Sequence, residues 1–203
     1  IIQVGYNFRF QKGLIKMKEL LDDGQIGRVL WARAEYGQYL PDWRPNQDYR
    51  NIYTAKKSEG GGILMDASHE IDYMLWLLGE IDTLHCIAGT ISDLEVDVED
   101  TASINLRFKS GSIGEIHLDF VQRAFSRTCK IVGTEGTLIW GALEPSLKWF
   151  NIDSNSWQNI NVESELNDKY RDEIETFLCI VNDSLETVND ATSGLRTLNV
   201  VLA

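Results

Sequence analysis

One segment of the 203-residue chain carries the residue types of a catalytic site. It begins at three consecutive glycines, Gly60, Gly61 and Gly62, and continues through Asp66 to His69. On a helix, a carboxylate and an imidazole three residues apart lie close enough for a hydrogen bond that fixes the imidazole tautomer. Such a pair is suited to take or give the proton of an alcohol, and the glycines allow a substrate or cofactor to approach the backbone closely.

The residues around this pair predict a helix from about residue 60 to residue 78, ended by Gly79. Its core face consists of apolar residues at helical spacing, namely Ala67, Ile71, Met74, Leu75 and Leu78. The opposite side carries Asp66, His69, Tyr73 and Trp76. Spacing alone also fits a plain amphipathic helix with an Asp–His pair on its surface, so both interpretations stay open at this point.

A long polar loop, residues 40–59, is the second candidate region. It places aromatic side chains beside charged ones, at Trp43, Arg44, Tyr49 and Arg50. Aromatic rings stack on sugars, and arginine or lysine side chains such as Arg44, Arg50 or Lys56 could neutralise a carboxylate or phosphate. The loop therefore suits a sugar or sugar acid, although a structural loop held by its own salt bridges has the same composition.

Composition narrows the class of protein. The net charge of −12 disfavours binding to nucleic acid and to anionic membrane surfaces. The chain has no run of about 18 apolar residues, and its first residues lack the pattern of a signal peptide. The three cysteines, Cys86, Cys129 and Cys179, are far apart, which favours reduced thiols in the cytoplasm.

We expect no metal site. Zinc sites use ligands two to four residues apart, and the cysteines are not spaced in this way. His117 lies between Glu115 and Asp119 on a predicted strand, where a metal site is one interpretation. A hydrated histidine, or one that faces a second copy of the chain, is the alternative that we prefer.

The order of predicted elements indicates a mixed α+β fold. Strands are predicted at residues 1–6, 28–39, 83–92, 101–108, 113–121, 128–133, 137–142 and 147–151. Helices are predicted at 11–23, at 60–78, from 191 to the end, and over a stretch in which Tyr170, Ile174, Phe177, Leu178 and Val181 share one face. Consecutive strands joined by tight turns pair antiparallel. We therefore predict a large, open, mostly antiparallel sheet with helices on one face and polar residues on the other.

Four segments together resemble the C-terminal domain of the glucose–fructose oxidoreductase, inositol dehydrogenase and MocA (Gfo/Idh/MocA) family. The stretch from Gly60 to Tyr73 resembles its glycine-rich signature with Asp, His and Asp. The other segments are Val4–Phe10, the helix Leu14–Leu21 followed by Gly24-Gln25-Ile26-Gly27, and Ile131–Leu138. Nearly the whole chain is covered, with the segments in the order of the family.

This resemblance implies a domain organisation. Residues 1–203 are a substrate-binding and dimerisation domain, with a junction strand at 1–10 and a terminal helix at 191–203. The family's N-terminal Rossmann domain and its Glu-Lys-Pro motif would precede Ile1, and no G-x-G-x-x-G occurs in the chain. NAD or NADP is then bound mainly by that other domain, with a contribution from Gly60, Gly61 and Gly62. The isolated chain is expected to be inactive.

The resemblance also assigns residues. His69 matches the histidine that exchanges the substrate hydroxyl proton, and Asp66 matches its paired aspartate, although the family spacing is four residues and here it is three. The expected substrate-binding set is Asn7, Arg9, Trp43, Arg44, Tyr49, Arg50, Asp72 and Tyr73.

The implied function is that of an NAD(P)-dependent sugar dehydrogenase, working as a homodimer or higher homo-oligomer through the open sheet. The alternative is a non-catalytic module for sugar binding or dimeric assembly.

Overall fold

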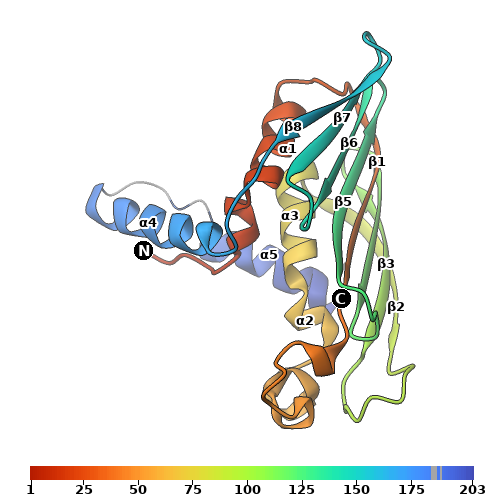
Figure 1. The fold of residues 1–203 in the computed structure, drawn as a ribbon, viewed down its shortest axis with the longest axis vertical. Helices are drawn as coiled ribbons and strands as arrows, with labels where there is room; N and C mark the ends of the chain where they lie inside the picture. The colour runs from red at the N-terminus through yellow and green to blue at the C-terminus, as the bar shows by residue number, and fades with distance from the viewer. Residues whose placement is uncertain (184–186, 188) are drawn as a thin grey trace.

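A computed structural model describes residues 1–183, 187 and 189–203. Helices lie against one face of a single large sheet, as Figure 1 shows. The helices are α1 (Lys12–Asp22), α2 (Ile63–Asp66), α3 (Ser68–Leu78), α4 (Asp168–Asp183) and α5 (Ala191–Leu202). A short 3-10 helix, η1 (Asn7–Phe10), precedes α1. No described helix has the combination of length and apolar character that crossing a membrane requires.

The sheet has eight strands in the order β2-β3-β4-β1-β5-β6-β7-β8. Their bounds are β1 Val29–Gly37, β2 Ile81–Gly89, β3 Thr101–Phe108, β4 Ile113–Asp119, β5 Ser126–Gly133, β6 Gly136–Gly141, β7 Ser146–Asn151 and β8 Ser156–Asn161. Neighbours pair antiparallel except β1 and β4, which pair parallel. The prediction of an α+β fold with an open, mostly antiparallel sheet is thereby confirmed, and the chain contains no Rossmann domain.

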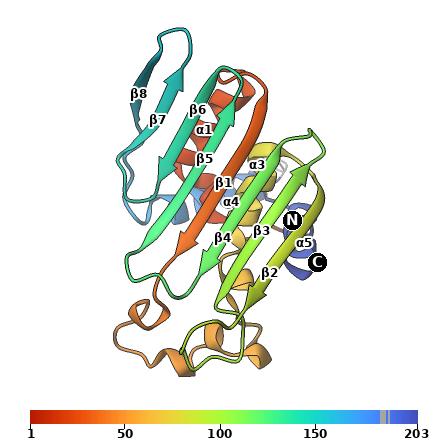
Figure 2. The same cartoon turned by 90° about the vertical axis from the view of Figure 1, so that its right-hand side faces the viewer.

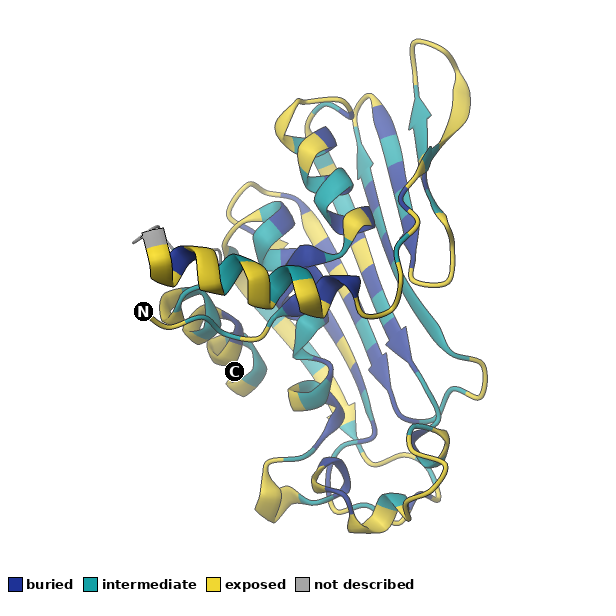
Figure 3. Ribbon diagram, turned by 60° about the vertical axis from the view of Figure 1, so that its left-hand side comes forward, coloured by how far each residue is buried: buried dark blue, intermediate teal, exposed yellow. Residues whose placement is uncertain are grey.

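The two faces of the sheet differ in polarity. On β4, Ile116 and Leu118 face the helices and are buried, whereas Glu115 is exposed on the other side. Figure 2 looks onto that side, which none of the described helices covers. The core therefore lies between the sheet and helices α1 to α3, as the burial colours of Figure 3 show.

The structure differs from the sequence prediction at three elements. Residues 1–6 form no strand, because they lie beside α5 and pair with no neighbouring strand; Val4 N–H donates to the carbonyl of Asn189. Strand β8 was not predicted. The predicted helix over residues 60–78 is divided into α2 and α3 at Ala67, whose φ of −100° and ψ of 24° interrupt the helix.

Helix α4 forms where predicted, but its apolar face points to solvent. Tyr170, Ile174, Leu178 and Val181 are each about half exposed. Lys169 and Ile180 are buried instead. Figure 1 shows α4 projecting sideways from the helical layer, so much of its length has no neighbour within the described chain.

Candidate active site

His69 is the second residue of α3 and lies between two aromatic rings of the N-terminal segment. Its ring centroid is 5.5 Å from that of Tyr6 and 5.2 Å from that of Phe8. The imidazole is partly buried, and its Nδ1 is buried with no hydrogen-bond partner among the described residues. One ring nitrogen of His69 is thus held in a fixed place with its hydrogen-bonding capacity unused.

The surroundings of His69 keep it neutral. Burial, together with the positive charges of Arg127 and Lys169, lowers the pKa of His69 to about 3. A neutral imidazole has one donor and one acceptor nitrogen. At neutral pH, His69 is therefore unprotonated and can accept a hydrogen bond from a hydroxyl group placed against it.

Asp66 is the last residue of α2, and it does not make the hydrogen bond to His69 that the sequence predicts. The Tyr53 hydroxyl donates to Asp66 Oδ1 at 2.7 Å, and Asp66 Oδ2 is buried without a partner in the described part of the chain. Burial raises the pKa of Asp66, while the hydrogen bond from Tyr53 and the charge of Arg44 oppose that rise. The break at Ala67 separates the two side chains, so the helical spacing assumed for a continuous helix does not hold.

The two aromatic residues predicted in the loop mainly hold the loop in place. The Trp43 indole N–H donates to the carbonyl of Gln38 at 3.1 Å, and its ring packs edge-on against Tyr36 and Phe120. The Tyr49 hydroxyl accepts from the amide of Glu95 at 3.1 Å. These contacts anchor the loop to the end of the sheet.

The two arginines of the loop differ in their partners. Arg50 binds both carboxylate oxygens of Asp48, at 2.7 and 2.9 Å, and also Glu95 at 3.1 Å. Arg44 is exposed, and its charge acts on both Asp66 and Tyr53. The structure thus joins Arg44, and not Arg50, to the catalytic candidate Asp66.

A buried ion pair connects two residues that the sequence assigned to substrate binding. Arg9 donates to Asp72 through Nε at 2.9 Å and Nη2 at 2.8 Å, with side chains 7% and 0% exposed. The Thr197 hydroxyl also donates to Asp72, at 3.2 Å. This network ties η1, α3 and α5 together and fixes the start of α3, where His69 lies.

Two other predicted residues lie away from the solvent. Tyr73 is fully buried in the core, so its position on the polar side of the predicted helix is not observed. Asn7 is 5% exposed, and its side-chain oxygen has no partner among the described residues.

The three glycines serve the packing of the chain. A Cβ on Gly61 would lie 2.3 Å from the carbonyl oxygen of Tyr53, and Gly60 and Gly62 have φ of 79° and 116°. Their amides donate to carbonyl groups of Lys57, Lys56 and Thr54. Since these N–H groups are already used, the described glycine segment offers no cradle of free amides to a dinucleotide.

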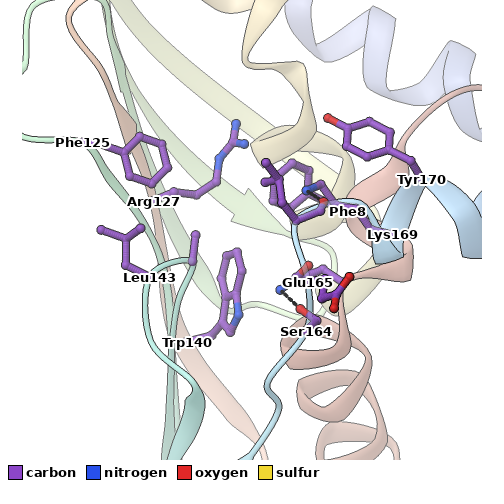
Figure 4. A pocket seen from close by; sticks show the side chains of 12 residues that line it. Phe8, Phe125, Arg127, Trp140, Leu143, Ser164, Glu165, Lys169 and Tyr170 are labelled. Atoms are coloured by element: carbon purple, nitrogen blue, oxygen red, sulfur yellow. Dashed lines mark hydrogen bonds between the residues drawn. The ribbon is translucent and has the colours of Figure 1, made fainter.

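The sequence analysis missed a pocket beside His69. Figure 4 shows this cavity of about 280 Å³, whose lining includes Phe8, Arg127, Trp140, Lys169 and Tyr170. Arg127 pairs with Glu70, with Nε 2.8 Å from Oε1 and Nη2 donating to Oε2 at 3.2 Å. One signal was present in the sequence: Arg127 lies two residues before the buried Cys129 on β5, and this spacing puts a charge on the core-facing side of the strand.

A comparison with protein families gives a match to the model described as the GFO/IDH/MocA C-terminal domain, over residues 14–139. Levoglucosan dehydrogenase from Pseudarthrobacter phenanthrenivorans is 28% identical over 165 residues, which cover 68% of this chain and 41% of that protein. Myo-inositol 2-dehydrogenase from Thermotoga maritima is 30% identical over 147 residues, which cover 68% of this chain and 40% of that protein. The chain spans about two fifths of the length of these relatives.

Solved structures share the fold. Levoglucosan dehydrogenase in complex with NADH and levoglucosan superposes with a TM-score of 0.86, at 22% identity, over 98% of this chain and 62% of that chain. An oxidoreductase from Agrobacterium radiobacter in complex with NAD+, L-tartaric acid and magnesium superposes with a TM-score of 0.83, at 19% identity, over 99% of this chain and 60% of that chain.

Proposed function

Because this chain belongs to the GFO/IDH/MocA family, as its C-terminal domain, we propose that it is the substrate-binding half of an NAD(P)-dependent oxidoreductase acting on a sugar or sugar-derivative hydroxyl. Two of its relatives are dehydrogenases of levoglucosan and myo-inositol, both of which carry ring hydroxyl groups. The observation that carries the proposal is the neutral His69 imidazole with its unpartnered, buried nitrogen at the start of α3.

In this proposal His69 accepts the proton of the substrate hydroxyl as the carbinol carbon is oxidised. Hydride acceptance is the chemistry that the nicotinamide supplies when it is bound. Asp66, which is partly exposed, binds a neighbouring hydroxyl of the substrate, and the hydrogen bond from Tyr53 holds its carboxylate in place. The Arg9–Asp72 pair positions α3 and does not contact the substrate, because both side chains are buried.

The proposal also includes a separate domain that binds the cofactor. Apolar residues are exposed on α4 at Tyr170, Ile174, Leu178 and Val181, and on α5 at Leu195, Leu198 and Leu202. Exposed apolar surface of this extent marks an interaction site. We assign it to docking of a dinucleotide-binding domain, which accounts for the remaining length of the relatives. Alone, this chain then transfers no hydride.

The uncovered sheet face supports homodimer formation. Ile87, Ser103 and Glu115 on its strands are exposed. No described helix lies over this face of the sheet (Figure 2). We place the assembly in the cytoplasm, where the three cysteines, free thiols in the structure, stay reduced.

The test compares the intact protein with the isolated chain. The intact protein should reduce NAD or NADP with at least one member of a panel of sugars, anhydrosugars and inositols. The isolated 203-residue chain, with its folding checked by circular dichroism, should show no saturable NAD binding by calorimetry. If the intact protein binds sugars but reduces neither cofactor, the non-catalytic sugar-binding alternative holds instead. Tight NAD binding by the isolated chain would overturn the assignment of the cofactor to another domain.

A further inference from the structure

The pocket beside His69 receives two cationic side chains from different elements. Arg127 enters from β5 and Lys169 from the first turn of α4, and both line the cavity of about 280 Å³ (Figure 4). Phe8 lines the same cavity and also contacts His69. Phe8 thus lies beside both the cavity and the catalytic candidate.

Arg127 is rigidly held, and its charge is already balanced. Glu70, which is 0% exposed, forms the ion pair with it. The guanidinium carbon of Arg127 lies 4.2 Å from the centre of the Phe8 ring and 4.1 Å from that of Tyr36. Nε and Nη2 face Glu70, while Nη1 has no hydrogen-bond partner among the described residues. A fixed guanidinium with free donors is suited to bind an anion in one geometry.

Lys169 is a buried cation without a balancing carboxylate. The residue is 8% exposed, and its ammonium group donates to the carbonyl of Leu166 at 3.0 Å. No acidic side chain of the described residues lies within ion-pair distance of it; the adjacent Asp168 pairs with Lys12 and Arg171. Burial and the charge of Arg127 both lower the pKa of Lys169. A buried charge without a counterion is unfavourable, so a ligand that supplies a negative charge is stabilised here.

The other charged residues near the pocket do not balance the positive charge of Lys169. Glu165 also lines the cavity, but it is exposed to solvent at the rim. In the 40–59 loop, by contrast, two of the four basic residues are paired within the loop: Arg50 with Asp48 and Lys56 with Glu59. Of the two cations that line the pocket, Arg127 is paired with Glu70, and Lys169 is the one whose charge no described carboxylate balances.

We propose that this pocket is a subsite for an anionic group on the substrate, a carboxylate or a phosphate, bound by the Lys169 ammonium and by Nη1 of Arg127. The inference rests on the proposed function, because it places the reacting hydroxyl at His69 and the acidic substituent on the far side of Phe8. The protein then acts on acidic or phosphorylated sugars in preference to neutral ones. The carbonyl of Leu166, the carboxylate of Glu165 and the Gln11–Ser164 hydrogen bond complete the polar lining.

The test is calorimetric binding to the intact protein of four probes: glucose, glucuronate, glucose 6-phosphate and inorganic phosphate. Lys169→Met keeps the length of the side chain and removes its charge, and Lys169→Arg keeps the charge. We expect Lys169→Met to weaken the binding of at least one acidic sugar by about tenfold or more. Glucose binding should change by less than about twofold, and Lys169→Arg should restore much of the loss. Glucuronate and glucose 6-phosphate distinguish a carboxylate from a phosphate.

The outcomes separate this inference from the proposed function. Equal binding of glucose and both acidic sugars, unaffected by Lys169→Met, would overturn the anionic subsite even if NAD or NADP is reduced with a neutral sugar. Lys169-dependent binding of an acidic sugar or of inorganic phosphate, without any reduction of NAD or NADP, would keep the subsite and overturn the oxidoreductase assignment. Thermal unfolding of both variants verifies that a loss of binding does not come from a loss of folding.

Discussion

At the scale of single residues, the three histidines of the chain have different surroundings. His85 is exposed, and His117 contacts Ser103 at 3.2 Å and Asp119 at 3.0 Å. His69 Nδ1, in contrast, is buried and unpartnered in the described chain. The sequence motif identified His69 because the motif is local. It could not identify Arg127 or Lys169 as its neighbours, because the packing of the sheet and α4 brings these distant residues to it.

The lowered pKa of His69 predicts a pH dependence of stability. Burial and the charges of Arg127 and Lys169 lower the pKa of His69 from 6.5 to about 3, so between these values the unfolded chain binds a proton at His69 and the folded chain does not. The contribution of His69 to the free energy of unfolding is therefore complete above about pH 6.5 and decreases as the pH falls toward 3. His69→Gln removes this dependence.

Urea unfolding of the protein and of His69→Gln, at pH 7 and at pH 5, measures the effect. The stability of the unsubstituted protein relative to His69→Gln should fall by about 1.4 kcal/mol for each pH unit well below 6.5. Because both proteins contain the carboxylates Asp66, Glu70 and Asp72, the contributions of these groups cancel when the two free energies of unfolding are subtracted. A difference that stays the same at both pH values would contradict the burial of a neutral imidazole.

At the scale of elements, local periodicity predicted most helices and strands, and the failures have physical reasons. Strand β8 was missed because five of its six residues are exposed, which leaves no alternation to detect. The break between α2 and α3 was missed because Ala67 favours helices, and here tertiary packing overrides that preference. The parallel pairing of β1 with β4 depends on where β1 enters the sheet, which neighbouring residues do not specify.

The glycine segment gives a prediction at this scale. Gly61→Ala should destabilise the protein by about 3 kcal/mol or more, because the new Cβ would meet the backbone oxygens of Tyr53 at 2.3 Å and Thr54 at 2.5 Å. Gly5→Ala is the matched control, since no atom lies within 4 Å of a Cβ there, and it should change stability by less than about 0.5 kcal/mol. Denaturant unfolding compares the two variants; similar values for both would show that the loop does not pack against the start of α2 as described.

At the scale of the whole molecule, one face of the sheet and the outer faces of α4 and α5 remain uncovered (Figures 1 and 2). The sequence predicted the open sheet from the alternation on β4, where apolar and polar residues take opposite sides. The sequence also predicted that apolar residues of α4 share a face. Whether that face points to the core or to solvent depends on the elements that pack beside α4. These uncovered surfaces are the reason why we treat the chain as one part of a larger assembly.

A substitution on the open sheet tests the proposed dimer. Ile87 is 70% exposed on β2 and pairs in register with Ser103 on the same face. Ile87→Glu should weaken dimerisation by about tenfold or more, because a carboxylate would be buried in the interface. Ile91→Glu is the control, as Ile91 is 73% exposed but lies beyond the end of β2. Sedimentation equilibrium measures the dimer dissociation constant of both variants. If Ile87→Glu dimerises as tightly as the unsubstituted protein, the interface lies elsewhere.

The most direct test of the account is the turnover number of the intact protein with His69→Ala, compared with His117→Ala. If His69 accepts the substrate proton, His69→Ala should lower the turnover number by about 10²-fold or more, while His117→Ala should leave it within about twofold. Both variants should bind the sugar and remain folded. An unchanged turnover number in His69→Ala would remove His69 from the reaction and contradict the central claim.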